Sequence, residues 1–137
     1  MADVEITLSS ETIHNPSEPR HFMRLRPVKR LVRVLLGDRV LVESRNAVRL
    51  IEVGKDVYEP VLYFPADDVT ARLAQAEGST HCPLKGDAVY FDLAADGDHE
   101  ARSKIAWSYP EPFDFAPDLA GLIAFYTNDL TIEECPL

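Results

Sequence analysis

Residues 31–44 read LVRVLLGDRVLVES and carry the clearest local structure in the chain. Apolar and polar residues alternate on both sides of Gly37-Asp38, and glycine supplies the positive φ that a two-residue hairpin turn needs. The pattern predicts two antiparallel strands with their valines on a buried face. The same period of two places Arg39 and Leu41 on the outer face.

Short apolar stretches continue after this hairpin, separated by Gly, Pro and Asp. The patterns predict strands at residues 47–53, 58–64, 88–94 and 101–108. The apolar run Leu119–Tyr126 fits a buried strand or a buried helix, and Gly121 inside it favours the strand. Residues 71–76 have a helical composition but span under two turns. We therefore predict a mainly β fold with little helix, a small antiparallel sandwich or barrel.

The chain of 137 residues suits one domain. Residues 29–130 are predicted to form a single β domain. Residues 1–28 are predicted to be an N-terminal arm, with an edge strand at residues 4–8. Residues 131–137 are predicted to be a frayed acidic tail.

The net charge of −9 argues against binding to nucleic acid or to an anionic membrane. Basic residues concentrate between Arg20 and Arg33, which fits either a solvated basic face or an arm for a polyanion. No apolar run approaches the roughly 18 residues of a membrane span, and the N-terminus lacks the pattern of a signal peptide. These observations predict a soluble cytoplasmic protein.

The two cysteines, Cys82 and Cys135, are too few and too far apart for a disulfide framework. Neither belongs to a C-x-x-C pair, so the usual spacing of zinc ligands is absent. The simplest expectation is a pair of free thiols in a reducing compartment.

Residues 80–87 read THCPLKGD and place several reactive groups on a segment that proline and glycine predict to be a rigid loop. Lys85, followed by Gly86, suits the binding of a small anion, or else forms a surface pair with Asp87. His81 is the candidate for acid–base catalysis, or else a hydrogen bond that holds the loop. Cys82 is poorly placed to act with His81, because adjacent residues of an extended chain point to opposite sides.

Aromatic residues supply a second set of candidates. Trp107 and Tyr109 lie on a proline-bounded segment and, with Tyr63, could form the wall of a ligand pocket or pack in the core. Arg45 lies at a junction between two predicted strands, where its side chain would point into a cleft or remain on the surface. The predicted ligand-binding set is Arg45, Tyr63, His81, Lys85, Asp87, Trp107 and Tyr109.

Four motifs in this order, YFP at 63–65, THCPLKGD at 80–87, AWSYPEP at 106–112 and IAFY at 123–126, resemble a bacterial family. It is the domain of unknown function family 427 (DUF427), sometimes labelled a nucleotidyltransferase. The resemblance covers about Lys29 to Leu130. It implies a β-tent fold, in which two small antiparallel sheets lean together over a pocket. Many β-tent proteins bind zinc through two C-x-x-C pairs; this chain has neither, so we expect no structural zinc, no other metal and no cofactor.

Three hypotheses about function follow. The first is a pocket for a small anionic ligand, nucleotide-like or a carboxylate, with or without catalysis by His81. The second is a non-enzymatic interaction module, monomeric or homodimeric, that uses the basic segment or the Leu119–Tyr126 run. The third, from the family label, is a nucleotidyltransferase, although the chain lacks a G-x-x-x-x-G-K-[ST] phosphate loop. These motifs fit an enzyme and a non-enzymatic binding protein equally.

Overall fold

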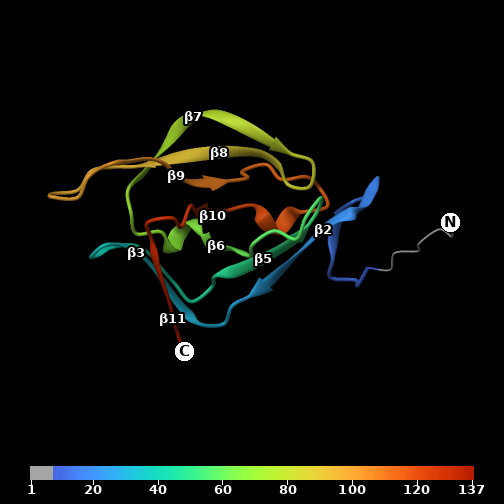
Figure 1. Cartoon of the computed structure of the whole chain (residues 1–137), viewed down its shortest axis with the longest axis horizontal. Coiled ribbons are helices and arrows are strands. Elements are labelled where there is room, and N and C mark those ends of the chain that lie inside the picture. Colours follow the sequence, from blue (N-terminus) through green and yellow to red (C-terminus); the bar gives the residue numbers. More distant parts are fainter. Residues whose placement is uncertain (1–7) are drawn as a thin grey trace.

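A computed structural model describes residues 8–137, which form two antiparallel β-sheets (Figure 1). The strands are β1 (Ile13–Asn15), β2 (Glu18–Pro27), β3 (Leu31–Leu36), β4 (Arg39–Ser44), β5 (Val48–Val53), β6 (Val61–Pro65), β7 (Leu73–Cys82), β8 (Gly86–Leu93), β9 (Arg102–Ser108), β10 (Leu122–Phe125) and β11 (Thr131–Cys135). The helical content of this part of the chain is two short 3₁₀ turns, η1 (Ala66–Asp68) and η2 (Pro117–Leu119). The predicted mainly β, two-sheet fold is confirmed.

The larger sheet has eight strands in the order β1-β2-β5-β6-β10-β9-β8-β7, and the smaller has the order β11-β3-β4. Neither sheet closes into a barrel within residues 8–137, so the sandwich alternative is the correct one. The large sheet is strongly curved: in Figure 1, β7, β8 and β9 lie above β5 and β2, with β10 and β6 between them. The curvature turns one face of this sheet inward upon itself.

The two faces of the large sheet build two separate cores. One face packs against the small sheet through a cluster that includes Val34, Phe64 and Phe125. The opposite, inward-turned face builds a second cluster around Leu50 and Tyr63. Because Tyr63 and Phe64 are neighbours in β6, the alternation of the strand divides adjacent aromatic residues between the two cores.

The predicted hairpin at residues 31–44 is present as β3 and β4, joined by Gly37-Asp38 with Gly37 at φ 61°. Its predicted faces are wrong from Arg39 to Leu41, whereas Val42 is buried and Glu43 is exposed as predicted. Val34 pairs with Val42 and Leu35 pairs with Val40, so Leu41 is an extra residue that forms a bulge. The bulge shifts the alternation by one residue, which buries Leu41 and leaves Val40 38 % exposed.

Two other local predictions are corrected. The helical segment predicted at residues 71–76 is instead extended, and β7 begins at Leu73 and pairs with β8 along a long hairpin. Backbone pairing with β8 outweighs a helical preference that spans too few residues to form an isolated helix. The tail is not frayed up to Cys135, since β11 pairs with β3.

The N-terminal segment joins the large sheet, where β2 pairs with β5 from Phe22 to Pro27. The edge strand predicted at residues 4–8 falls almost wholly outside the described residues. Across residues 8–137, no helix has the length and apolar character to cross a membrane.

Candidate functional site

A row of side chains crosses four strands on the inward-turned face of the large sheet. Tyr63 in β6 lies opposite Ala124 in β10, Ala124 lies opposite Trp107 in β9, and Trp107 lies opposite Tyr90 in β8. The small side chain of Ala124 leaves space between its two aromatic neighbours. Tyr63 and Trp107 meet edge to face across that space, with ring centroids 6.3 Å apart and an interplanar angle of 86°.

The aromatic members of this row line a pocket of about 240 Å³ on the same face. All five tyrosines of the chain and its single tryptophan line this pocket. They come from four separate stretches of the sequence: Tyr58 and Tyr63, Tyr90, Trp107 and Tyr109, and Tyr126. Curvature of the sheet therefore gathers residues that are remote in sequence around one small cavity, called the aromatic pocket below.

Hydrogen bonding leaves tyrosine hydroxyl groups available inside the aromatic pocket. Trp107 Nε1 donates to Tyr63 Oη at 3.2 Å, so the Tyr63 hydroxyl keeps its own proton for another acceptor. The Tyr109 hydroxyl has no hydrogen-bond partner within residues 8–137. Burial is the main cause that raises the pKa of both phenols well above its ordinary value of 10.0. Both hydroxyls are therefore protonated donors at neutral pH.

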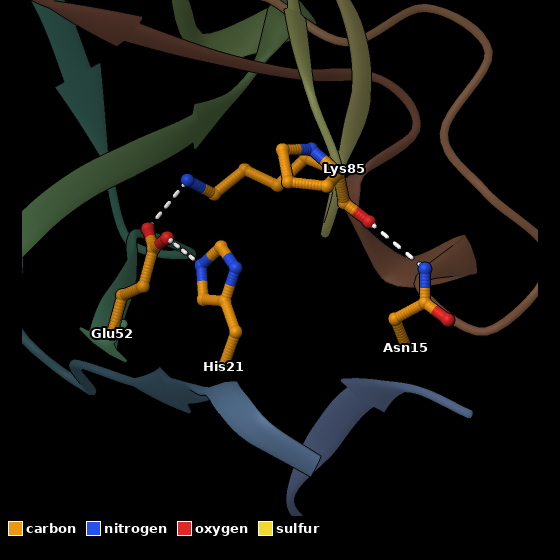
Figure 2. Close-up of polar contacts among 5 residues, drawn as sticks. Asn15, His21, Glu52 and Lys85 are labelled. Carbon is orange, nitrogen blue, oxygen red and sulfur yellow. Dashed lines mark hydrogen bonds and ion pairs between the residues drawn. The ribbon is translucent and has the colours of Figure 1, made fainter. Parts of the chain in front are cut away.

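A buried ion pair forms one wall of the aromatic pocket. Lys85, in the turn between β7 and β8, places Nζ 2.5 Å from Glu52 Oε1 in β5. His21 in β2 lies on the other side of the carboxylate, with Nε2 2.7 Å from Glu52 Oε2 (Figure 2). Lys85 and Glu52 are only 8 % and 9 % exposed. Lys85 Nζ also lies 5.7 Å from the centre of the Tyr109 ring, a cation–π contact.

These contacts fasten the two ends of the curved sheet to each other. The turn carrying Lys85 belongs to the β7–β8 end of the sheet, whereas His21 and Glu52 lie on β2 and β5 toward the β1 end. Asn15 Nδ2 adds a second link by donating to the carbonyl oxygen of Pro83 in the same turn (Figure 2). We call the trio of His21, Glu52 and Lys85 the clasp. The clasp joins the two ends of the sheet through side chains, whereas a closed barrel joins its first and last strands through backbone hydrogen bonds.

The clasp predicts a specific sensitivity to acid. Burial raises the pKa of the Glu52 carboxyl, but hydrogen bonds from His21 and Lys85 outweigh burial and hold it below the ordinary value of 4.5. A carboxyl whose pKa is depressed by folding stabilises the fold above its unfolded pKa and loses that contribution as the pH falls through its folded pKa. We expect Glu52→Gln to reduce the dependence of unfolding free energy on pH below 4.5, measured by urea denaturation at a series of pH values.

Glu133→Gln is the matched control for this acid experiment. Glu133 is exposed on β11 and takes part in no ion pair in the described part of the chain. Its substitution should leave the acid dependence as in the wild type. Equal effects of the two substitutions would contradict the role given to Glu52.

The structure brings four of the predicted site residues together and separates three. Tyr63, Lys85, Trp107 and Tyr109 all line the aromatic pocket. His81 and Asp87 instead pair with each other on the exposed surface of the β7–β8 hairpin, with His81 Nδ1 2.8 Å from Asp87 Oδ1. Arg45 is exposed just after β4 and does not line this pocket.

The segment at residues 80–87 is largely strand rather than loop. Residues up to Cys82 belong to β7, Gly86 begins β8, and the turn comprises Pro83, Leu84 and Lys85. Lys85 does not pair with Asp87, because Asp87 faces His81 while Lys85 points inward to Glu52. The hairpin thus gives Lys85 and His81 different surroundings although they are four residues apart.

Two members of the clasp, Glu52 and His21, lie outside the set of site residues predicted from the sequence. Glu52 shares a strand face with Val48 and Leu50, and a carboxylate on an otherwise apolar face is a signal that could have identified it. No local signal identifies His21, because its proximity to Glu52 depends on the pairing of β2 with β5. Tyr58, Tyr90 and Tyr126 were also outside the predicted set, although they are the remaining tyrosines of the chain.

A comparison with family models matches residues 24–135 to a family described as Domain of unknown function (DUF427), under the label NTP_transf_9. The chain belongs to this family. The match includes all four motifs that carried the resemblance and extends over β11. No curated protein matches the chain. The DUF427 domain thus comprises the small sheet and nearly all of the pocket-bearing large sheet.

Proposed function

We propose that this DUF427 protein binds a small, uncharged, planar molecule that carries hydrogen-bond acceptors. The observation that carries the proposal is the gathering of all five tyrosines and the only tryptophan around one cavity of about 240 Å³. Pockets for drug-sized ligands span about 300–1,000 Å³. A cavity below that range favours a ligand of one or two rings, such as a nucleobase or an aromatic amide.

The walls of the aromatic pocket favour a planar ligand. Trp107 and Tyr126 lie with ring centroids 4.5 Å apart on one side, and Trp107 meets Tyr63 at a right angle. Aromatic side chains thus make up most of the lining of the cavity. Stacking on such surfaces is worth about 1–3 kcal/mol for a nucleobase.

Hydrogen-bond donors in the aromatic pocket favour acceptor atoms on the ligand. Tyr63 and Tyr109 hold protonated hydroxyls, and an ammonium has three N–H groups, of which Lys85 gives one to Glu52. A carbonyl oxygen on a flat ring would satisfy these donors without bringing in a charge. A small number of polar groups on an aromatic wall orients the ligand and makes binding specific for it.

The charge of the pocket supports an uncharged ligand over the anionic one expected from the sequence. The positive charge of Lys85 is balanced by Glu52 at 2.5 Å, and Glu59 adds a second carboxylate to the lining. An anion would compete with Glu52 for Lys85 and leave a carboxylate buried without its partner, which is costly. The chain as a whole also carries a net charge of −9.

The label NTP_transf_9 points to nucleotidyl transfer. Transfer of a nucleotidyl group needs a divalent cation held by carboxylates. Glu52 and Glu59 both line the aromatic pocket, but each oxygen of Glu52 already accepts a hydrogen bond from the clasp. We therefore propose binding without transfer, and a titration repeated with Mg²⁺ and a nucleoside triphosphate tests the alternative through release of pyrophosphate.

Trp107 provides a direct test, because the only tryptophan of the chain is a wall of the aromatic pocket. Titration with uracil, adenine and benzamide should produce a saturable change in tryptophan emission for at least one of them. Benzoate and choline serve as charged probes of similar size. We expect Tyr109→Phe, which removes one donor and keeps the ring, to weaken binding of the responding probe by about tenfold.

Val57→Ala is the control for this titration, because Val57 is an exposed apolar residue outside the pocket lining. It should bind the responding probe with wild-type affinity. The proposal fails if none of the neutral probes changes the emission saturably, or if benzoate binds more tightly than benzamide.

A further inference from the structure

A second cavity, of about 360 Å³, lies away from the aromatic pocket where β4 begins. Three segments form it: the start of β4, residues 70–72 ahead of β7, and the connection between β8 and β9. Figure 1 shows the β3–β4 turn and the β8–β9 connection on the same side of the molecule. The ionisable residues that line this cavity are Arg39, Arg72, His99 and Asp96. We call it the arginine cavity.

Arg39 is the unusual member of the arginine cavity. It is only 7 % exposed, although the alternation of β4 predicted it outside. Its Nη2 donates to the carbonyl oxygen of Ala94 at 2.9 Å, while its buried Nη1 has no hydrogen-bond partner. No carboxylate within residues 8–137 forms an ion pair with it. A buried guanidinium without a counter-charge is costly, and each such group in a native protein calls for an explanation.

The surroundings of Arg39 add further positive charge. Arg72 is exposed and forms no ion pair with any described residue. His99 Nε2 lies 2.8 Å from Asp38 Oδ1, and this hydrogen bond raises the pKa of the imidazole, favouring its cationic form. Asp96 is the acidic side chain of the lining. Among the side chains that line the arginine cavity, two guanidinium groups, those of Arg39 and Arg72, stand against one carboxylate, that of Asp96. Asp38 lies outside the lining and is hydrogen-bonded to His99.

We infer that the arginine cavity binds an oxyanion of the phosphate type, with Arg39 supplying the buried charge and Arg72 the charge at the rim. Guanidinium groups match the geometry of phosphate and carboxylate oxygens. The anion would provide the counter-charge that Arg39 lacks in the protein. This site is independent of the aromatic pocket and of its proposed ligand. An anion-binding function expected at Lys85 therefore belongs at Arg39, since Lys85 is neutralised by Glu52 and Arg39 is not.

Inorganic phosphate and glycerol 3-phosphate are the probes for this inference, each titrated by calorimetry at constant ionic strength with chloride as the reference anion. We expect both to bind and to raise the melting temperature above its value in chloride. Equal affinities would assign the site to phosphate alone, and tighter binding of the ester would assign it to a larger phosphorylated molecule. Arg72→Gln should weaken phosphate binding by about tenfold, the loss of one charge-assisted contact.

Arg45→Gln is the matched control, because Arg45 is also exposed, also lacks an ion pair with the described residues and does not line the arginine cavity. It makes the same change of net charge and should leave the affinity for phosphate unchanged. Arg39→Gln should abolish phosphate binding. Arg72→Gln is nevertheless the decisive variant, because Arg72 is exposed and its substitution leaves the core intact. The inference is overturned if phosphate acts no differently from chloride, or if Arg72→Gln and Arg45→Gln weaken binding equally.

Discussion

Replacing Lys85 with methionine is expected to lower the free energy of unfolding by about 3 kcal/mol. Methionine keeps most of the volume of the lysine side chain, so the change removes the charge more than the packing. Glu52 would then remain buried with His21 as its only described partner. Removing one member of a buried ion pair costs this much because the other charge loses its compensation. Urea denaturation, followed by Trp107 fluorescence, measures the loss.

Lys104→Met is the matched control for this substitution. Lys104 Nζ lies 5.7 Å from the centre of the Tyr90 ring, the same distance as Lys85 Nζ from Tyr109, but Lys104 is exposed and forms no ion pair in the described part of the chain. Its loss should change stability by no more than about 0.5 kcal/mol. Equal losses from the two substitutions would show that the cation–π contact, and not the pairing with Glu52, determines the role of Lys85.

A double variant separates charge from shape at the clasp. Substituting Glu52→Leu together with Lys85→Met removes both buried charges, and apolar replacement of a whole buried pair is often neutral. We expect the double variant to recover a large part of the stability lost in Lys85→Met. His21 loses Glu52 as its partner in the double variant. Water can solvate the His21 side chain instead, because that side chain is 22 % exposed. A double variant less stable than Lys85→Met would contradict this account.

The sequence was sufficient to predict the β3–β4 hairpin and most of the central strands, but not β1, β2, β7 and β11, nor the faces next to the β3–β4 turn. The alternation at residues 31–44 and the turn at Gly37-Asp38 fix a hairpin through local chemistry alone. The bulge at Leu41 arises from pairing with β3 and from the cores on either side, and it reverses the side on which Val40 lies. Arg39 becomes buried in the same region. Local periodicity carries no information about an inserted residue, which is why the buried arginine had no signal in the sequence.

At the candidate site too, the local sequence pattern indicated some of the residues, whereas the way they come together depends on pairing between strands that are distant in the sequence. Tyr63, Trp107 and Tyr109 were named from the sequence because amphipathic aromatic residues beside proline suit either a pocket wall or the core. Their convergence depends on β10, which lies between β6 and β9 and brings Ala124 between two of the rings. The clasp depends on the curvature of the whole sheet, since His21 and Lys85 are 64 residues apart in numbering, 85 minus 21. Pairing of distant strands cannot be read from the local pattern.

The turn that positions Lys85 depends on glycine at position 86, where φ is 120°. A Cβ added to Gly86 would lie 3.2 Å from the backbone carbonyl oxygen of Glu111 and 3.5 Å from Pro112 Cα. Backbone atoms of that neighbouring segment have little freedom to move, because Phe113 N–H donates to the carbonyl oxygen of Lys85. We expect Gly86→Ala to destabilise the fold by about 3 kcal/mol, the combined cost of a positive φ and of close contact.

Gly37→Ala is the control that separates these two costs. Gly37 also has a positive φ, 61°, but a Cβ there would have no atom within 4 Å. Its substitution should cost only about 1 kcal/mol, the price of the left-handed conformation alone. Gly86→Ala should in addition weaken the response of Trp107 fluorescence to the neutral planar probes, since a displaced turn moves Lys85 away from Glu52 and the aromatic pocket, whereas Gly37→Ala should leave that response unchanged. Similar losses of stability in both variants, with the probe response intact in both, would mean that Gly86 serves only the turn and that the position of Lys85 does not depend on it.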